Sequence, residues 1–175
     1  MKDLTKKHIA DKMKELMRRK PLAKIRTTEI CEKAEIDRST FYYHFRDKYD
    51  LVAWIFYDSA FSTNILNKKE AAASLKQVKK DYLFYKRANE DNSQNPLWQY
   101  MHEYYVGRYT EIAKEKLGTD ILDKETLFSI RLYSYGTIAM SRDWAFGDDP
   151  TPAEEEVEMM YQSMPQKLQD IFFTA

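Results

Sequence analysis

The sequence is poor in the residues that make turns, disulfides and membrane spans. Its 175 residues include only 4 glycines and 5 prolines, too few for a β-sandwich or β-barrel, in which turns recur about every 8 to 12 residues. Cys31 is the only cysteine, so no disulfide can form within the chain, as is usual in a reducing cytoplasm. The longest stretch without a charged residue, Asn92 to His102, is much shorter than the about 20 residues of a membrane-spanning helix. We therefore expect an all-α, cytoplasmic protein with no membrane segment and no signal peptide.

The charges are balanced in number but not in position. The chain has 28 Lys and Arg and 28 Asp and Glu. Residues 1–50 hold 14 of the basic and 9 of the acidic residues, a net charge of +5, which leaves −5 for residues 51–175. A basic first part joined to an acidic second part is typical of a nucleic-acid-binding domain with a separate regulatory domain. The alternative is a solvated basic helix face without a nucleic-acid partner.

Motifs for catalysis and for cofactor or metal binding are missing from the sequence. The four glycines are isolated, so no phosphate-binding glycine loop can form. His102-Glu103 begins like a zinc-binding helix motif, but Val106 stands where the second histidine is required. We expect neither an enzyme nor a bound metal or cofactor, although a catalytic site assembled from distant residues stays an alternative.

The first fifty residues predict three helices, over 3–20, 27–34 and 38–44. The first carries an apolar stripe of Ile9, Met13, Leu16 and Met17 and ends before Pro21. Thr27 or Thr28 can cap the second helix, and Asp37 can cap the third. Two short helices after a longer one predict a three-helix bundle with a helix-turn-helix, whose second short helix enters the DNA major groove.

The remaining residues predict four or five longer helices. One starts at Lys48 behind Asp47 and fades near Asn67; the next carries Leu75 to Tyr85. Further helices run from Pro96 to Gly118, over 124–146, and from Pro152 onward, where Pro165 must kink or split the helix. We therefore expect a DNA-binding domain over 1–50 and an effector-binding and dimerisation domain over 51–175.

The third predicted helix carries the candidate DNA contacts. Arg38, Ser39 and Thr40 lie at its start, where side chains reach base edges, and Arg suits a bidentate bond to guanine. Phe41 and Phe45 are four residues apart and should face inward. The polar tips of Tyr42, Tyr43 and His44, and the charge of Lys48, suit phosphate oxygens. The alternative for Tyr42 and Tyr43 is that they are residues at the edge of the core.

This stretch resembles the TetR/AcrR family of bacterial transcription regulators. The T-x-x-I-x-x-x-A motif corresponds to residues 27–34, and the T-[FL]-Y-x-H-F-x-x-K-x-x-L motif corresponds to residues 40–51. The resemblance implies that Thr27 or Thr28 also holds phosphate, and that a homodimer represses transcription from a palindromic double-stranded DNA operator. Glu35 stands where the family usually has glycine, and a left-handed turn there costs about 1 kcal/mol.

The second half looks like regulators grouped with the dihydroxyacetone-kinase operon regulators, and the family resemblance implies a dimer built from the last two long helices. The interface residues that we expect are Ser134, Thr137, Ser141, Val157, Met160, Met164, Leu168 and Ile171; ordinary packing within one chain is the alternative. The effector-binding residues that we expect are Tyr100, Tyr104, Tyr105, Arg108 and Arg131. The alternative is that the tyrosines belong to the core and that the arginines are solvated or salt-bridged. The effector is a small molecule or, alternatively, a protein partner, and the sequence does not identify it.

Overall fold

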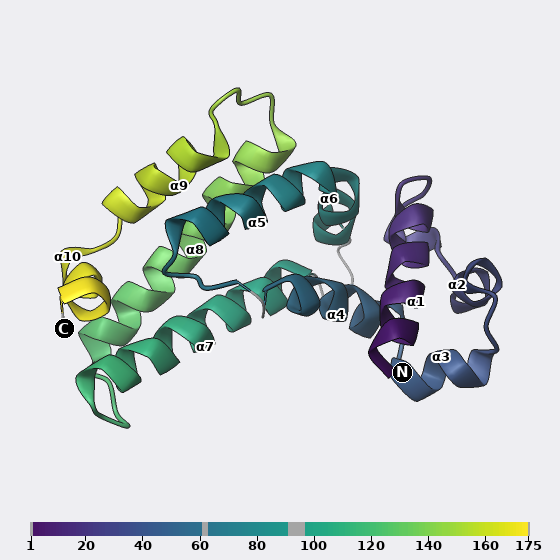
Figure 1. Cartoon of the computed structure of the whole chain (residues 1–175), viewed down its shortest axis with the longest axis horizontal. Coiled ribbons are helices and arrows are strands. Elements are labelled where there is room, and N and C mark those ends of the chain that lie inside the picture. Colours follow the sequence, from purple (N-terminus) through teal and green to yellow (C-terminus); the bar gives the residue numbers. More distant parts are fainter. Residues whose placement is uncertain (1, 61–62, 91–96, 175) are drawn as a thin grey trace. The chain divides into compact units, whose positions relative to one another are not determined.

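The computed structural model describes residues 2–60, 63–90 and 97–174, and every regular element in these ranges is helical (Figure 1). The elements are α1 (Lys2–Met17), the short 3-10 helix η1 (Leu22–Lys24), α2 (Thr27–Ala34), α3 (Arg38–His44), α4 (Lys48–Ala60), α5 (Lys68–Lys80), α6 (Tyr82–Glu90), α7 (Leu97–Leu117), α8 (Lys124–Phe146), α9 (Ala153–Gln162), α10 (Gln166–Gln169) and the π-helical turn η2 (Asp170–Thr174). The predicted all-α fold is confirmed. Within the described ranges, no helix is long and apolar enough to cross a membrane.

The chain forms two compact units, and neither is a single continuous stretch. The first unit comprises residues 1–62 and 81–97, and the second comprises residues 63–80 and 98–175. Helices α1 to α4 and α6 therefore belong to the first unit, while α5 and α7 to α10 belong to the second. The boundary after residue 50, which separates the expected functions, stays a prediction.

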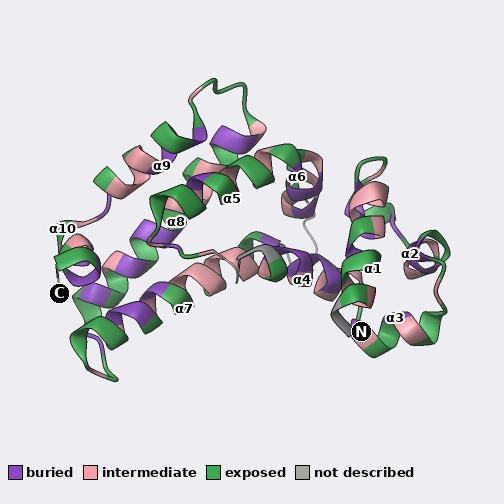
Figure 2. Ribbon diagram, viewed as in Figure 1, coloured by how far each residue is buried: buried purple, intermediate pink, exposed green. Residues whose placement is uncertain are grey.

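In the first unit, α1 packs against α2, α4 and α6. Its predicted stripe is confirmed in part, because Ile9, Met13 and Met17 are fully buried whereas Leu16 is half-buried. Figure 2 shows that α4, in the same unit, is mostly buried or half-buried where its burial is described. The helix ends at Met17 rather than at the predicted residue 20. The carbonyl of Leu16 then accepts the N–H groups of two following residues at 2.9 and 3.1 Å, which turns the chain before Pro21.

A single residue breaks the helix that the sequence predicts from Leu75 to Tyr85. Asp81 separates α5 from α6, and its backbone carbonyl accepts the N–H groups of Phe84 and Tyr85 at 2.9 and 3.2 Å. Its buried carboxylate lies 3.0 Å from the ammonium of Lys14 on α1 and 3.6 Å from the guanidinium of Arg18, which directly follows α1. The break therefore joins α6 to α1.

In the second unit, α5 packs against α8 and α9, and α10 packs against α8. One apolar cluster centres on Trp144 and Val157, and another contains Tyr109, Ile130 and Leu168. The predicted helix over 124–146 coincides with α8, whose first turn is capped by the Asp123 carboxylate through the Thr126 N–H at 2.8 Å. Pro165 splits the last helix into α9 and α10, as predicted.

Candidate DNA-binding site

The turn between α2 and α3 has the left-handed geometry that the sequence predicts. Glu35 has φ 53° and ψ 43°. The N–H of Ile36 donates to the Cys31 carbonyl at 3.0 Å, which closes the end of α2. The helix-turn-helix is therefore built without the usual glycine, at a cost of about 1 kcal/mol.

Two phenylalanines fix the orientation of α3. Phe41 and Phe45 are buried, as predicted, and their ring centroids are 5.9 Å apart. Because residues four apart share one helix face, the opposite face of α3 is left to solvent. Tyr42 is 49% exposed and Tyr43 is 66% exposed, which argues against the alternative that they are residues at the edge of the core.

The structure brings most of the predicted DNA contacts to α2 and α3. Those that are exposed are Thr28, Arg38, Ser39, Tyr42 and Tyr43, and those that are half-buried are Thr27, Thr40, His44 and Lys48. The Arg38 guanidinium carbon lies 6.0 Å from the centre of the Tyr42 ring, within the range of a cation–π contact. Tyr42 can therefore help to hold Arg38 in place, and contact between these side chains and DNA stays a prediction.

The predicted caps of the two short helices are only partly right. Thr27 and Thr28 lie inside the first turn of α2 rather than capping it, and Arg26 occupies the N-cap position. The Glu29 carboxylate accepts the Arg26 N–H at 2.8 Å and pairs with Lys20. The ammonium of Lys20 and then this N–H lower the pKa of Glu29. Asp37 is the N-cap of α3, as predicted, but its side chain makes no capping hydrogen bond.

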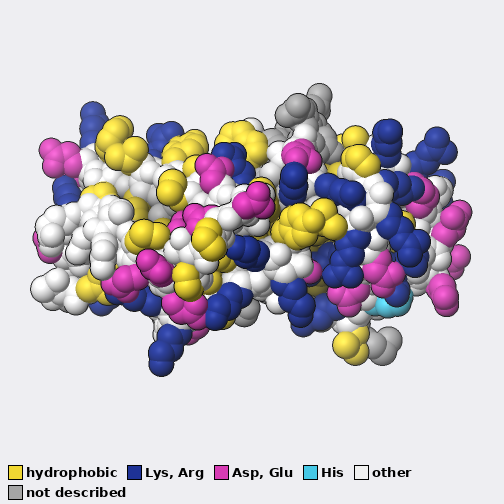
Figure 3. All heavy atoms as spheres, turned by 90° about the horizontal axis from the view of Figure 1, so that it is seen from above, with side chains coloured by type: hydrophobic (Ala, Val, Ile, Leu, Met, Phe, Trp, Pro, Cys, Tyr) yellow, Lys and Arg dark blue, Asp and Glu magenta, His cyan; other side chains and the backbone are white. Residues whose placement is uncertain are grey.

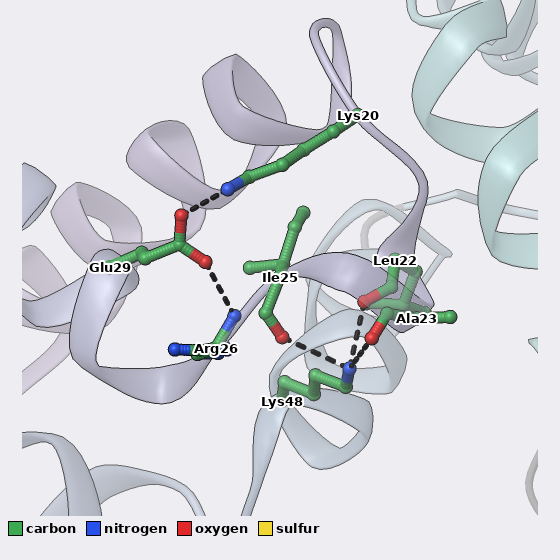
Figure 4. Close-up of polar contacts among 7 residues, drawn as sticks. All are labelled: Lys20, Leu22, Ala23, Ile25, Arg26, Glu29 and Lys48. Carbon is green, nitrogen blue, oxygen red and sulfur yellow. Dashed lines mark hydrogen bonds and ion pairs between the residues drawn. The ribbon is translucent and has the colours of Figure 1, made fainter.

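Lys48 makes contacts within the chain, and its predicted contact with a phosphate stays a prediction. It is the first residue of α4, and its ammonium donates to the carbonyl oxygens of Leu22, Ala23 and Ile25 at 2.8, 3.2 and 3.0 Å (Figure 4). An ammonium has three N–H donors, and this arrangement occupies all three. A long lysine stem can turn toward the protein as easily as toward solvent, so these bonds do not test a contact between Lys48 and DNA.

An open groove of about 580 Å³ lies between α2 and α3. Its lining includes the predicted contacts Thr28, Arg38 and Thr40, the carboxylates of Glu32, Glu35 and Asp37, and the thiol of Cys31. Burial raises the pKa of that thiol, so it stays protonated. Since carboxylates repel phosphate, the surroundings of Arg38 suit a contact with a base edge better than a contact with the DNA backbone.

Positive charge gathers elsewhere on the first unit. Figure 3 shows many Lys and Arg side chains close together toward the right of the view, where this unit lies. In the sequence, α1 and the segment up to Arg26 supply most of these residues. Lys24 and Arg26 are exposed immediately before α2, so both can reach a phosphate near the first turn of that helix.

The residues predicted for an effector have mixed surroundings. Tyr100, Tyr104 and Tyr105 are half-buried on α7, and burial raises the pKa of Tyr104. Arg108 is exposed and lies 3.4 Å from Glu111 on its own helix, in keeping with the solvated alternative. Arg131 is exposed on α8. Effector binding by this set stays a prediction.

Histidine 102, on α7, lies close to Arg131. Its ring packs against that of Tyr135 on α8, with 3.4 Å between the ring centroids. Burial, and then the charge of Arg131, lower the pKa of His102. The imidazole is therefore held in its neutral form at this point between α7 and α8.

Most residues of the predicted dimer interface are covered within the single chain. Val157, Met164, Leu168 and Ile171 are buried within the single chain, where they pack in the two clusters of the second unit. Ser134 is also fully buried. Three half-buried residues also make contacts within the chain. The Met160 carbonyl accepts a hydrogen bond from the Tyr133 hydroxyl at 3.0 Å, and the Thr137 hydroxyl donates to the Tyr133 carbonyl at 2.9 Å. The Ser141 hydroxyl lies 3.9 Å from the Met160 sulfur. Packing within one chain, the alternative, accounts for the buried residues, and a role of the half-buried ones in a dimer stays a prediction.

A different face of α8 is apolar and exposed. Phe128 is 67% exposed, Leu132 59%, Tyr135 48% and Met140 57%. Phe128, Leu132 and Tyr135 follow the i, i+4, i+7 spacing of one helix face, which we call the outer face of α8. The signal was present in the sequence, because α8 carries apolar residues around most of its circumference.

Comparisons with known proteins agree with this arrangement. Residues 9–55 match the family model described as "Bacterial regulatory proteins, tetR family", and residues 69–166 match that described as "Transcriptional regulator C-terminal region". No curated protein matches the chain. A solved structure, "Dihydroxyacetone kinase operon activator DhaS", shares the fold with a TM-score of 0.64 and 20% identity, over 94% of this chain and 96% of that chain. With a helix-turn-helix at its start and a matching regulator region after it, the chain belongs to the TetR family of DNA-binding transcriptional regulators.

Proposed function

We propose that the protein binds a palindromic DNA operator as a homodimer and represses transcription until an effector changes its affinity for DNA. The observation that carries the proposal is the exposed polar face of α3, which Phe41 and Phe45 hold outward from the core. A single short helix makes few base contacts, so two reading helices must act together on half-sites about one helical turn, or a multiple of it, apart.

The outer face of α8 is the surface that we propose for dimerisation. Its three regularly spaced side chains, Phe128, Leu132 and Tyr135, present a continuous apolar row. Burial of apolar surface stabilises association by about 25 cal/mol per Å² before the entropic costs of binding. The face replaces the stripe of α9 that the sequence analysis favoured.

Effector control is proposed to operate as a shift between two conformational populations. An effector changes DNA affinity only to the extent that it binds one arrangement of the two reading helices more tightly than the other. The name of DhaS describes that protein as an activator, so the direction of regulation needs its own test: a reporter whose promoter overlaps the operator should be repressed by this protein.

The test of DNA reading is selection of bound sequences from random duplex DNA, followed by comparison of two arginine variants. Arg38→Ala should weaken operator binding by about 1–3 kcal/mol and relax the preference at one base position in each half-site. In the absence of any effector, Arg108→Ala is the matched control, because Arg108 is exposed in the second unit and pairs with Glu111. If Arg38→Ala weakens operator and random DNA by the same factor, Arg38 does not read a base.

A further inference from the structure

The turn between α2 and α3 contains the only non-glycine residue with a positive φ among the residues that the structure describes. That residue is Glu35, with φ 53°. The chain places glycine in the same conformation at the end of α7, where Gly118 has φ 62°. Glutamate adopts this conformation at least about fivefold less readily than glycine does. A contact that holds the turn therefore matters more here than in a turn made with glycine.

His8, early in α1, makes such a contact. Its Nε2 lies 3.0 Å from the carbonyl oxygen of Ala34, which is the last residue of α2 and 26 residues later in the chain. Because a carbonyl only accepts hydrogen bonds, Nε2 carries the hydrogen and donates it. This carbonyl belongs to the planar peptide group that joins Ala34 to Glu35, and the φ of Glu35 sets the orientation of that plane. The bond therefore restrains the strained torsion angle itself.

The histidine is well placed to act as an anchor. Its own side chain is exposed, but the next residue, Ile9, is fully buried, and α1 packs against α2. The N–H groups of the turn already donate to earlier carbonyls, to that of Cys31 at 3.0 Å and to that of Glu32 at 3.3 Å. The last carbonyls of a helix have no partner within the helix. His8 therefore supplies, from α1, a donor that the turn lacks for Ala34.

We propose that His8 is a positioning residue for DNA reading: its hydrogen bond to Ala34 holds the left-handed turn at Glu35 and thereby fixes the start of α3. The inference rests on the proposed DNA-binding function. Arg38 lies three residues beyond Glu35, so a rotation of the turn displaces its guanidinium from the base edges. Contacts to base edges carry the sequence preference, whereas phosphate contacts form on any duplex. Loss of the bond should therefore weaken operator binding more than binding to random DNA.

Three substitutions at one position separate the hydrogen bond from the mere presence of a side chain. His8→Ala removes the donor and should weaken operator binding by about three- to tenfold, with less than about a twofold change on random duplex. His8→Gln keeps an N–H donor at the reach of Nε2, so it should bind the operator within about twofold of the wild type. His8→Asn is the matched control, because its shorter amide ends near the position of Nδ1; it should behave as His8→Ala does.

Two results of this comparison would overturn the proposal. Equal operator affinities for His8→Gln and His8→Asn would show that a donor at the position of Nε2 is not what matters. An equal loss on operator and random DNA in His8→Ala would show that His8 contributes to backbone binding rather than to the placement of α3.

Glu35→Gly tests whether the bond acts through the strained turn. Glycine adopts the left-handed conformation without the steric penalty, so the turn then depends less on its contact with α1. In the Glu35→Gly background, His8→Ala should cost less than about twofold in operator affinity. Additive effects of the two substitutions would refute action through Glu35.

Hydrogen exchange tests the contact without DNA, and so separately from the proposed function. In His8→Ala, the amides of Glu35 and Ile36, which are hydrogen-bonded within the turn, should exchange faster, while those of α8 keep their wild-type rates. Unchanged exchange at the turn would refute its dependence on His8. If the wild-type protein binds no duplex selectively while exchange behaves as expected, the proposed function is refuted, and with it the role in DNA reading, but the anchoring of the turn by His8 stands.

Discussion

Removal of the Asp81 charge should release α6 from α1. The Asp81 side chain is 7% exposed and lies 3.0 Å from Lys14 and 3.6 Å from Arg18, whose side chains are 26% and 58% exposed. Asp81→Asn keeps the size of the side chain and removes its charge. The variant therefore probes the ion pairs with little change in packing.

The expected loss of stability lies between those of an exposed and a buried ion pair. Two unit charges 4 Å apart attract by about 4 kcal/mol near a protein surface, but desolvation of the carboxylate offsets much of this. The pair with the exposed Arg18 contributes at most about 1 kcal/mol. Both cations can turn toward water after the change, so we expect a net loss of about 2–3 kcal/mol, less than the penalty for a fully buried pair.

For a chain of this size that loss corresponds to a fall in Tm of about 4–12 °C. Circular dichroism measures the fall, and hydrogen exchange should show faster exchange in α6 than in α8. Asp143→Asn is the control, because it removes an exposed pair with Arg142 and should change stability by less than about 0.5 kcal/mol. Equal Tm values for the two variants would refute the role of Asp81 as an anchor of α6.

Two further predictions concern the second unit. Burial, and then the charge of Asp149, raise the pKa of Glu156, so the stability of the fold falls as the pH rises through that raised pKa. In urea unfolding, Glu156→Gln should therefore be more stable than the wild type at pH 7, and the difference should vanish below about pH 4. An equal difference at both pH values would contradict the reasoning. Leu132→Asp places a charge on the outer face of α8, and sedimentation should find a helical monomer with weakened operator binding; a dimer that still binds operator would show that this face is not the interface.

Local signals in the sequence predict the helix-turn-helix and several helix ends. The helix over 124–146 and the break of the last helix at Pro165 were predicted from nearby residues, because periodicity and proline effects act over short stretches of chain. Phe41 and Phe45 are placed by their spacing alone. The polar face of α3 was predictable for the same reason, since it is what remains when the two phenylalanines face inward.

Contacts between distant residues were not predictable in this way. The spacing of Val157 and Leu168 identifies an apolar face, but it does not reveal whether a second chain or the same chain covers that face. The presence of a lysine at position 48 does not reveal which acceptors its ammonium reaches. Asp81 breaks a helix because its carboxylate pairs with a lysine 67 residues earlier, which no local pattern records.

The division of the chain between its two units has a consequence for synthesis on the ribosome. The chain passes from one unit to the other after residues 62, 80 and 97. Helix α5 is made early but packs against α9, and its Lys76 pairs with Glu154, 78 residues later. At about 5–20 residues per second, α5 waits roughly 4–16 s for that partner.

During this interval the apolar side of α5, which carries Ala72, Leu75 and Val78, has no native surface to cover it. The first unit can be completed sooner, because α6, the last of its helices, directly follows α5 in the sequence. The DNA-binding helices are therefore complete while the second unit is still open, and the nascent chain passes through a stage in which α5 is a target for chaperones.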